Sequence, residues 1–218
     1  LAEAELRFLA ETSAVLGASL SYAATLQQVA ALMVPRLADL CTVELVDPEG
    51  GITPVAVVHS NPTKQIWVQT LRQQYPPQFD TPNGIGYVLQ TGRSAFYPRI
   101  AEEQLLAVVP DATYRRLLQQ IGFKSVLIVP LQVRDQILGT LTLARTETDQ
   151  PYREAELHLA EEVAKRAALA VDNARLYEEA QQAERQLRRM NETLEQRVQA
   201  RTSELERRNR DLDQFAYI

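Results

Sequence analysis

The sequence predicts an α+β domain followed by a long C-terminal coiled-coil helix, and three observations support this prediction. Two pairs of strand-like segments are each joined by a short polar turn, which favours antiparallel hairpins. The segments around these hairpins have helical spacing and capping residues, so helices are expected to flank the sheet. The stretch from Tyr152 to Ile218 contains no glycine and no proline, which favours one long helix.

The N-terminal part predicts two helices and the first hairpin. A helix is expected over Ala2–Gly17, and Ser21 is an N-cap candidate for a second helix that ends near Pro35–Leu37. Apolar and polar residues then alternate through Cys41–Val46, as in a strand. After a turn rich in proline and glycine, Ile52–Val58 is expected to return as its antiparallel partner.

The middle of the chain predicts a mostly helical excursion between the two hairpins. Asn61 followed by Pro62 is typical of a helix start, because asparagine caps the helix and proline suits its first position. The expected elements are a helix from Pro62 to the Pro76-Pro77 pair, a short helix over Gly84–Thr91, a strand over Ser94–Tyr97, partial helix within Pro98–Pro110 and a helix over Asp111–Gly122.

The second hairpin consists of two long strands, Ser125–Val133 and Ile137–Thr146, around a polar turn. The sequence therefore predicts five strands in one antiparallel sheet, with Pro151 preceding the long helix.

Within the long helix, apolar residues recur in steps that alternate four and three, which is the heptad pattern of a coiled coil. The step of four from Leu194 to Val198 follows another step of four, a stutter that locally unwinds the supercoil. Dimerisation through this seam is expected; the alternative is a single charged helix without a partner. The predicted seam is Leu169, Leu176, Ala183, Leu187, Met190, Leu194, Val198, Leu205 and Leu212.

Catalytic and metal-binding patterns are scarce. The two histidines, His59 and His158, have no neighbours at metal-ligand spacing. The chain has no phosphate-binding glycine motif and no nucleophile elbow. Cys41 is expected to be a small core residue, with a reactive thiol or chromophore attachment as the alternative. No catalytic residue and no metal site are therefore predicted, and the chain is not expected to be an enzyme.

Aromatic residues gather in the helical excursion, where a long insert over a sheet can build a ligand pocket. The alternative is that they fill a second hydrophobic layer. The candidate pocket residues are His59, Trp67, Tyr75, Tyr87, Tyr97 and Phe123.

Composition limits the partners. The net charge of −5 argues against a nucleic-acid-binding surface. No apolar run reaches the roughly 18–20 residues of a membrane span, so direct membrane insertion is not expected. The single cysteine rules out an internal disulfide and fits a reducing, cytoplasmic compartment.

Several motifs together resemble the GAF domain of bacterial signalling proteins, over about residues 5–180. They are Val34–Cys41, Gly84–Gly86 with Leu89–Arg93, Ser125–Leu131, Leu138–Leu143 and Ala167–Tyr177. The resemblance implies a sheet of the six-stranded type and terminal helices that pack as a dimer bundle. It also implies a small-molecule ligand in many members. The signatures of the cyclic-nucleotide and bilin-binding members are absent, so the cofactor is unknown, and bilin, haem and cyclic nucleotide are not supported by motifs.

The C-terminal tail resembles the linker of sensor histidine kinases. The similar segments are Asn191–Val198 with Arg201–Leu205, and Asp213–Ile218 resembles the approach to the phosphoacceptor histidine. This implies a parent histidine kinase, an ATP-dependent phosphotransferase with a downstream kinase core and a response regulator as partners. The acceptor histidine would follow Ile218, so no kinase activity is expected of this chain.

The expected organisation is an N-terminal bundle helix over residues 1–20, a sensory domain over 21–177 and a coiled-coil signalling helix over 178–218. The expected function is a dimeric, cytoplasmic sensory and signal-transmitting module of a two-component sensor histidine kinase. The alternatives are a ligand-free dimerising spacer, or the regulatory domain of another output enzyme such as a phosphatase or cyclase.

Overall fold

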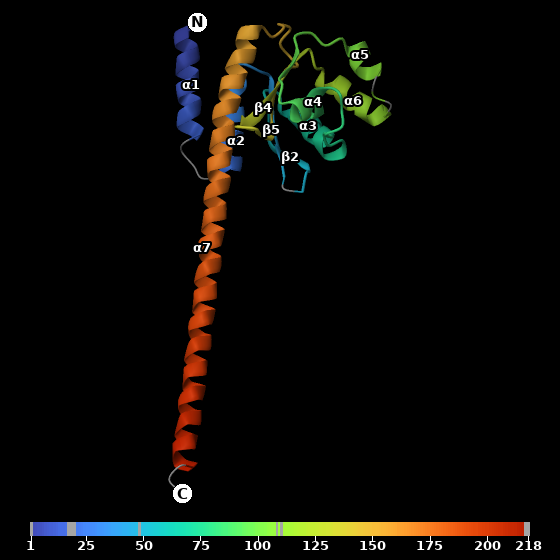
Figure 1. Cartoon of the computed structure of the whole chain (residues 1–218). Helices are drawn as coiled ribbons and strands as arrows, with labels where there is room; N and C mark the ends of the chain where they lie inside the picture. The colour runs from blue at the N-terminus through green and yellow to red at the C-terminus, as the bar shows by residue number, and fades with distance from the viewer. Residues whose placement is uncertain (1, 17–20, 48, 108, 110, 216–218) are drawn as a thin grey trace. The chain divides into compact units, whose positions relative to one another are not determined.

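The computed structural model describes residues 2–16, 21–47, 49–107, 109 and 111–215 (Figure 1). The chain divides into two compact units, Leu1–Ala174 and Arg175–Ile218, called unit 1 and unit 2. The helices are α1 (Ala2–Leu16), α2 (Tyr22–Met33), α3 (Pro62–Gln74), α4 (Gly84–Thr91), α5 (Glu102–Ala107), α6 (Ala112–Ile121) and α7 (Glu154–Phe215). The strands are β1 (Leu40–Val46), β2 (Ile52–His59), β3 (Ala95–Tyr97), β4 (Ser125–Val133) and β5 (Gln136–Arg145).

The sheet of unit 1 has the order β2-β1-β5-β4-β3, and every neighbouring pair is antiparallel. Thr42 of β1 lies opposite Thr142 of β5, which in turn lies opposite Ile128 of β4. The α+β fold with a five-stranded antiparallel sheet is therefore confirmed. The two predicted hairpins are β1 with β2 and β4 with β5.

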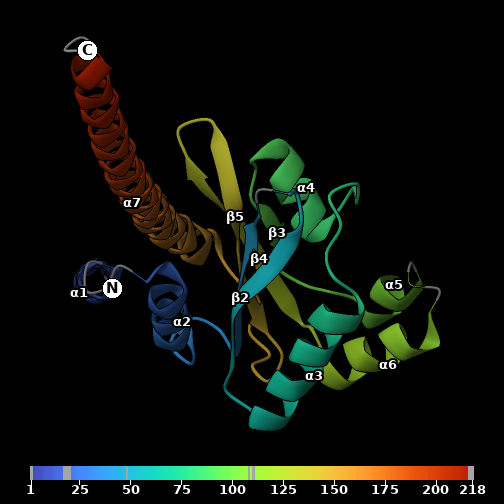
Figure 2. The ribbon, with the colours of Figure 1, turned by 90° about the horizontal axis from the view of Figure 1, so that it is seen from below.

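Helices cover both faces of the sheet, and Figure 2 shows α1 and α2 on one side and α3, α4, α5 and α6 on the other. Core 1 lies under α1, α2 and the first part of α7; it includes Val29, Met33, Val43, Leu141 and Val163. Core 2 lies under the helical excursion; it includes Leu40, Val68, Leu71, Val88 and Ile121. Because both faces are covered, side chains on either face of the central strands are buried.

Four residues that flank the helices of the excursion act as caps. The Asn61 side chain accepts a hydrogen bond from the Thr63 N–H at the start of α3, and Asp111 accepts one from the Tyr114 N–H at the start of α6. Gly92 and Gly122 end α4 and α6 with φ angles of 65° and 73°, in the left-handed region that favours glycine. These four caps determine where α3 and α6 begin and where α4 and α6 end.

Two expected boundaries differ from the structure. Helix α2 ends at Met33, before the expected stop at Pro35–Leu37, because Val34 precedes proline and is extended. Its N-cap position is Ser21, but the serine side chain makes no capping hydrogen bond. The expected stop of α1 at Gly17 lies outside the described residues.

The first part of α7 packs on unit 1 through small residues. Ala160, Val163, Ala164, Ala167 and Val171 recur three or four positions apart, and all five are buried. Arg166 donates a hydrogen bond from Nη1 to the Leu9 carbonyl of α1 at 2.9 Å. The beginning of α7 is therefore an integral part of unit 1. None of the helices in the described ranges is long and apolar enough to cross a membrane.

Candidate functional site

A buried carboxylate lies on an inner strand of the sheet, on the sheet face that core 2 covers. Glu44 of β1 is 0% exposed, although charged residues rarely occupy such positions. Thr42 donates its hydroxyl to Glu44 Oε1 at 2.8 Å, and Thr140 of β5 donates to Oε2 at 3.3 Å. Strand β1 itself and the neighbouring strand β5 therefore each supply one hydroxyl donor to the carboxylate.

The counter-charge of Glu44 comes from helix α3. Arg72 Nε lies 2.9 Å from Glu44 Oε1, and the Arg72 side chain is only 16% exposed. The contact is electrostatic rather than a well-aligned hydrogen bond, since Arg72 Nε has no geometrically acceptable partner within the described residues. The hydroxyl of Thr142, beside Thr42 across the strands, is likewise buried without one.

This polar cluster of Thr42, Glu44, Arg72, Thr140 and Thr142 combines a paired charge with unfilled hydrogen-bonding capacity. Buried polar groups are usually satisfied by protein, water or ligand. Such a cluster can bind a polar ligand, or it can hold β1, β5 and α3 in one arrangement.

Five of the six predicted pocket residues pack against the same hydrophobic core. Trp67, Tyr75, Tyr87, Tyr97 and Phe123 are all partly buried and pack against core 2. They thus form part of the hydrophobic layer over the sheet, as the alternative interpretation expects. Whether they also bind a ligand stays a prediction.

Two of these tyrosines have polar partners. Tyr75 stacks on Tyr114, with ring centroids 4.5 Å apart, and donates its hydroxyl to Asp111, the N-cap of α6. This hydrogen bond is the main cause that raises the pKa of Tyr75. The Tyr97 hydroxyl accepts from the Gly84 N–H at 3.2 Å. These contacts fix the ends of α3, α4 and α6.

His59, the sixth candidate, belongs to a different network at the end of β2. Its Nδ1 accepts the Asn61 N–H at 2.8 Å, so Nε2 carries the proton of the neutral ring and faces Thr146 Oγ1 at 3.0 Å. Burial and the charge of Lys64 lower the pKa of His59, while Glu147 and Asp39 act in the opposite direction. Because the His59 ring is neutral and both of its nitrogens have hydrogen-bond partners, its role here is structural.

The network around His59 holds the loop between β5 and α7. Asp39 Oδ2 accepts the backbone N–H groups of Thr146, Glu147 and Thr148 at 2.8–2.9 Å, and Oδ1 accepts the Thr148 hydroxyl at 2.9 Å. Burial opposes the charged form of Asp39, but these hydrogen bonds outweigh it and keep the pKa below its usual value. One carboxylate therefore ties the start of β1 to the segment before α7.

A second set of contacts fixes the first turn of α7. Arg145, the last residue of β5, donates to the Gln150 carbonyl at 2.6 Å and pairs with Glu156. Its guanidinium lies 4.4 Å from the Tyr152 ring centroid, over a tyrosine that is 2% exposed. The direction in which α7 begins is thus set by a charged residue of the sheet.

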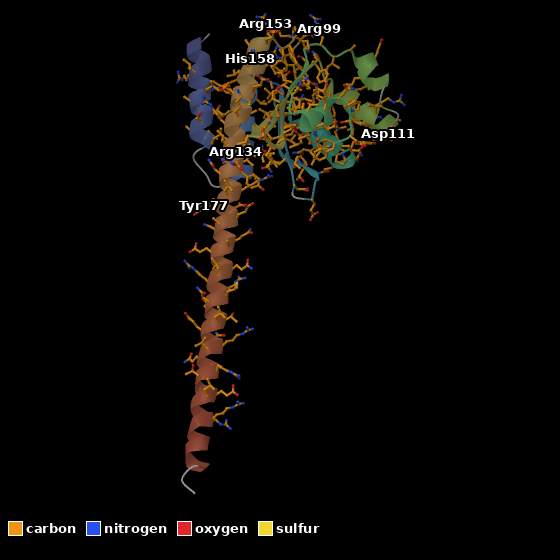
Figure 3. All side chains as sticks on the ribbon, in the orientation of Figure 1. Arg99, Asp111, Arg134, Arg153, His158 and Tyr177 are labelled. Atoms are coloured by element: carbon orange, nitrogen blue, oxygen red, sulfur yellow. The ribbon has the colours of Figure 1, made fainter. Side chains whose placement is uncertain are left out.

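Cys41 and His158 lie in two contrasting environments. Cys41 is fully buried in core 1, and burial raises the pKa of its thiol, with a further contribution from Glu44. His158 lies on an exposed side of α7, 3.4 Å from Glu161 (Figure 3). In the described ranges, no group of three or more histidine, cysteine, aspartate or glutamate side chains is arranged to hold a metal ion.

The predicted seam residues with described side chains are exposed in this single chain. Leu169 belongs to unit 1, and the others belong to unit 2. Their exposed fractions are 52% for Leu169, 56% for Leu176, 60% for Leu187, 53% for Met190 and Leu194, 64% for Val198 and 57% for Leu205, and Ala183 is also exposed. The side chain of Leu212 lies outside the described part of the structure.

Sequence reasoning missed the polar cluster and the Asp39 network. The only sequence signal was a lone glutamate among apolar strand residues, which an alternating pattern assigns to the solvent face. Its burial depends on α3, which is far away in the sequence.

The comparisons with known proteins agree with this architecture. The model of the GAF domain family matches residues 6–171. The GAF domain of an Acinetobacter phosphoenolpyruvate-protein phosphotransferase is 16% identical with a TM-score of 0.61, over 81% of this chain and 97% of that chain. Residues 122 to 287 of a methyl-accepting chemotaxis protein are 14% identical with a TM-score of 0.56, over 76% and 98%. A domain from Sinorhizobium meliloti 1021, named as a two-component sensor histidine kinase protein, is 14% identical with a TM-score of 0.50, over 72% and 95%. At these identities the structures share the fold alone.

Proposed function

The chain belongs to the GAF domain family, and we propose that it is the dimeric sensory and signal-transmitting module of a two-component sensor histidine kinase. A state change in unit 1 reaches the output through α7, which pairs with α7 of a second copy. A small molecule or an upstream domain supplies the signal, and the kinase core of the parent protein, with its response regulator, receives it.

The observation that carries this proposal is the exposed apolar stripe of unit 2. Four leucines of this stripe are each more than half exposed, and burying one leucine side chain fully is worth about 1.5–3 kcal/mol; they are Leu176, Leu187, Leu194 and Leu205. The stripe follows the heptad spacing over several turns, so one partner helix of the same sequence covers it as a coiled coil.

The surface of unit 2 also offers a place for a partner side chain. Asn191, Leu194, Glu195, Val198 and Gln199 line a shallow groove where the two steps of four meet. In coiled coils, a side chain of one helix inserts into a hole formed by four residues of the other. This groove has the residue spacing of such a hole, and a second copy supplies the apolar residue that fills it.

Two further observations support the kinase context. The tail segments Asn191–Val198 and Arg201–Leu205 resemble the linker before a kinase dimerisation domain. The domain from Sinorhizobium meliloti shares the fold and is named as a sensor histidine kinase protein. Autophosphorylation on histidine by the parent protein with ATP tests this part, and a parent without that activity contradicts it.

A second candidate, a ligand-free dimerising spacer, is favoured by the packing of core 2. Its aromatic side chains cover the sheet, and Glu44 already has three protein partners. Native mass spectrometry of protein purified from its source separates the candidates. A bound small molecule supports the sensor, and an unliganded mass with unchanged dimerisation supports the spacer.

Sedimentation equilibrium at micromolar concentration tests the dimer. The L187E/L194E variant places two charges in the seam and is expected to weaken dimerisation by at least about 100-fold. The control Q182E/Q196E adds the same charge on an exposed face outside the seam and is expected to stay dimeric. A monomeric wild type, or equal loss in both variants, would refute the seam.

A further inference from the structure

Helix α3 contacts two polar networks of unit 1 with its opposite ends. Its last turn carries Arg72, which pairs with the buried Glu44 at 2.9 Å. Its first turn carries Lys64, which lies 3.1 Å from Glu147 Oε1 in the loop that leads to α7. One short helix thus joins the polar cluster in the sheet to the entry of the output helix.

The attachment at the first turn has several contacts. Lys64 Nζ also donates to the Ile121 carbonyl at 2.9 Å and approaches the Thr146 carbonyl at 3.5 Å. Asn61, the N-cap of α3, donates its side-chain amide to Glu147 Oε1 at 3.4 Å. The ammonium group is therefore held between α6 and the loop, with its side chain only 16% exposed.

The helix between the two attachments is short and well packed. Lys64 and Arg72 are eight positions apart in the sequence, about 12 Å along a helix axis. Val68 and Leu71 between them are 1% and 3% exposed, in core 2. A packed helix of this length moves as one body, so a displacement at Arg72 also displaces Lys64.

The loop, in turn, is joined to α7 on both sides. Asp39 holds the backbone of Thr146–Thr148, and Arg145 holds Gln150 and Glu156. We propose that α3 is a coupling element: a change in the Glu44–Arg72 contact shifts α3 and, through Lys64 and Glu147, alters the stability of the first turns of α7. The proposal rests on the signal-transmitting function only for its biological purpose, since every contact lies within unit 1.

Hydrogen–deuterium exchange in the full chain tests this coupling. The R72Q variant removes the contact to Glu44. It is expected to raise the exchange rate of the amides of residues 157–164 in α7 by about fivefold or more. In the background K64Q/E147Q, which lacks the link to the loop, the same substitution is expected to have less than half that effect. The control R116Q removes an equivalent charge from the exposed face of α6 and is expected to leave the exchange of α7 unchanged.

Exchange in residues 62–74 reports directly on α3 and serves as the internal reference. If R72Q changes that segment but not residues 157–164, or if its effect is the same in both backgrounds, the coupling is refuted. If R72Q does not fold, T140V replaces it, because it removes one hydroxyl donor to Glu44 with little change in shape. Repeating the series in L187E/L194E separates this result from dimerisation, because the coupling is expected to persist in this variant. A wild type that is monomeric but shows the coupling would contradict only the seam.

Discussion

Removing Arg72 is predicted to destabilise unit 1 more than neutralising its partner. In R72M the apolar stem remains, but the carboxylate of Glu44, which is 0% exposed, keeps only the hydroxyls of Thr42 and Thr140. A buried charge that has lost its partner costs about 3–5 kcal/mol. This range is the expected loss in the free energy of unfolding for R72M.

The variant E44Q is expected to lose less. The amide has a similar shape, its oxygen can accept from one threonine hydroxyl while its NH2 group donates to the other, and the partly exposed Arg72 side chain can turn toward water. Loss of hydrogen bonds to a charged group costs about 1.5–3 kcal/mol. In R72M/E44Q no charge stays buried, so adding E44Q to R72M should restore about 2 kcal/mol.

Urea unfolding followed by the fluorescence of Trp67 measures these differences, since Trp67 lies on α3 and is the only tryptophan. A loss of 3–5 kcal/mol corresponds to a fall in melting temperature of roughly 6–20 °C for a chain of this size. The decisive quantity is the sign of the change in the free energy of unfolding when E44Q is added to R72M. If E44Q destabilises R72M further, the destabilisation of R72M does not come from an unpaired buried carboxylate, and the reasoning about the cluster is wrong.

Two further predictions concern His59 and Cys41. Because the folded pKa of His59 is lowered, its contribution to stability is fully present above the unfolded pKa of about 6.5 and is lost as pH falls through the folded pKa. Melting temperatures between pH 7.5 and 5 should therefore fall less in H59Q than in the wild type and in the exposed control H158Q; equal slopes in all three would contradict this. Cys41 should not react with a thiol reagent in the native state, while Q182C on the exposed helix should react within minutes and Cys41 should follow only in urea. Rapid reaction of native Cys41 would show that core 1 opens readily.

Local chemistry made most of the fold predictable. Asn61 and Asp111 cap helices through their own side chains, and Gly92 and Gly122 end helices because they adopt positive φ angles. These signals act over three or four residues, so the sequence alone contains them. The strands were found for the same reason, since alternation is a property of adjacent residues.

The candidate site was not predictable in the same way, because its environment comes from distant segments. Glu44 looks like a solvent-facing residue of β1, and only the helical excursion turns its surroundings into an interior. Asp39 receives its hydrogen bonds from residues more than a hundred positions later. No short pattern distinguishes such an aspartate from a surface one. Five of the aromatic pocket candidates pack against core 2, and a ligand there stays a prediction, while His59 lies in the separate network of Asp39 and Thr146.

The apolar residues of helix α7 differ in size and exposure between unit 1 and unit 2, and this difference follows from what each part packs against. In unit 1 its buried face is built from small residues such as Ala164, Ala167 and Ala168, which let the helix backbone lie close to core 1. In unit 2 most apolar seam positions are large, as in Leu187 and Leu194, with Ala183 as a small exception, and the described residues of this chain leave them exposed. Small residues are sufficient where a complementary surface already exists within the same chain. Large ones contribute more binding energy per position, which a helix needs when its partner is a separate molecule. The change from small to large residues along one continuous helix therefore separates the part that folds with unit 1 from the part for which we propose a second copy as the partner.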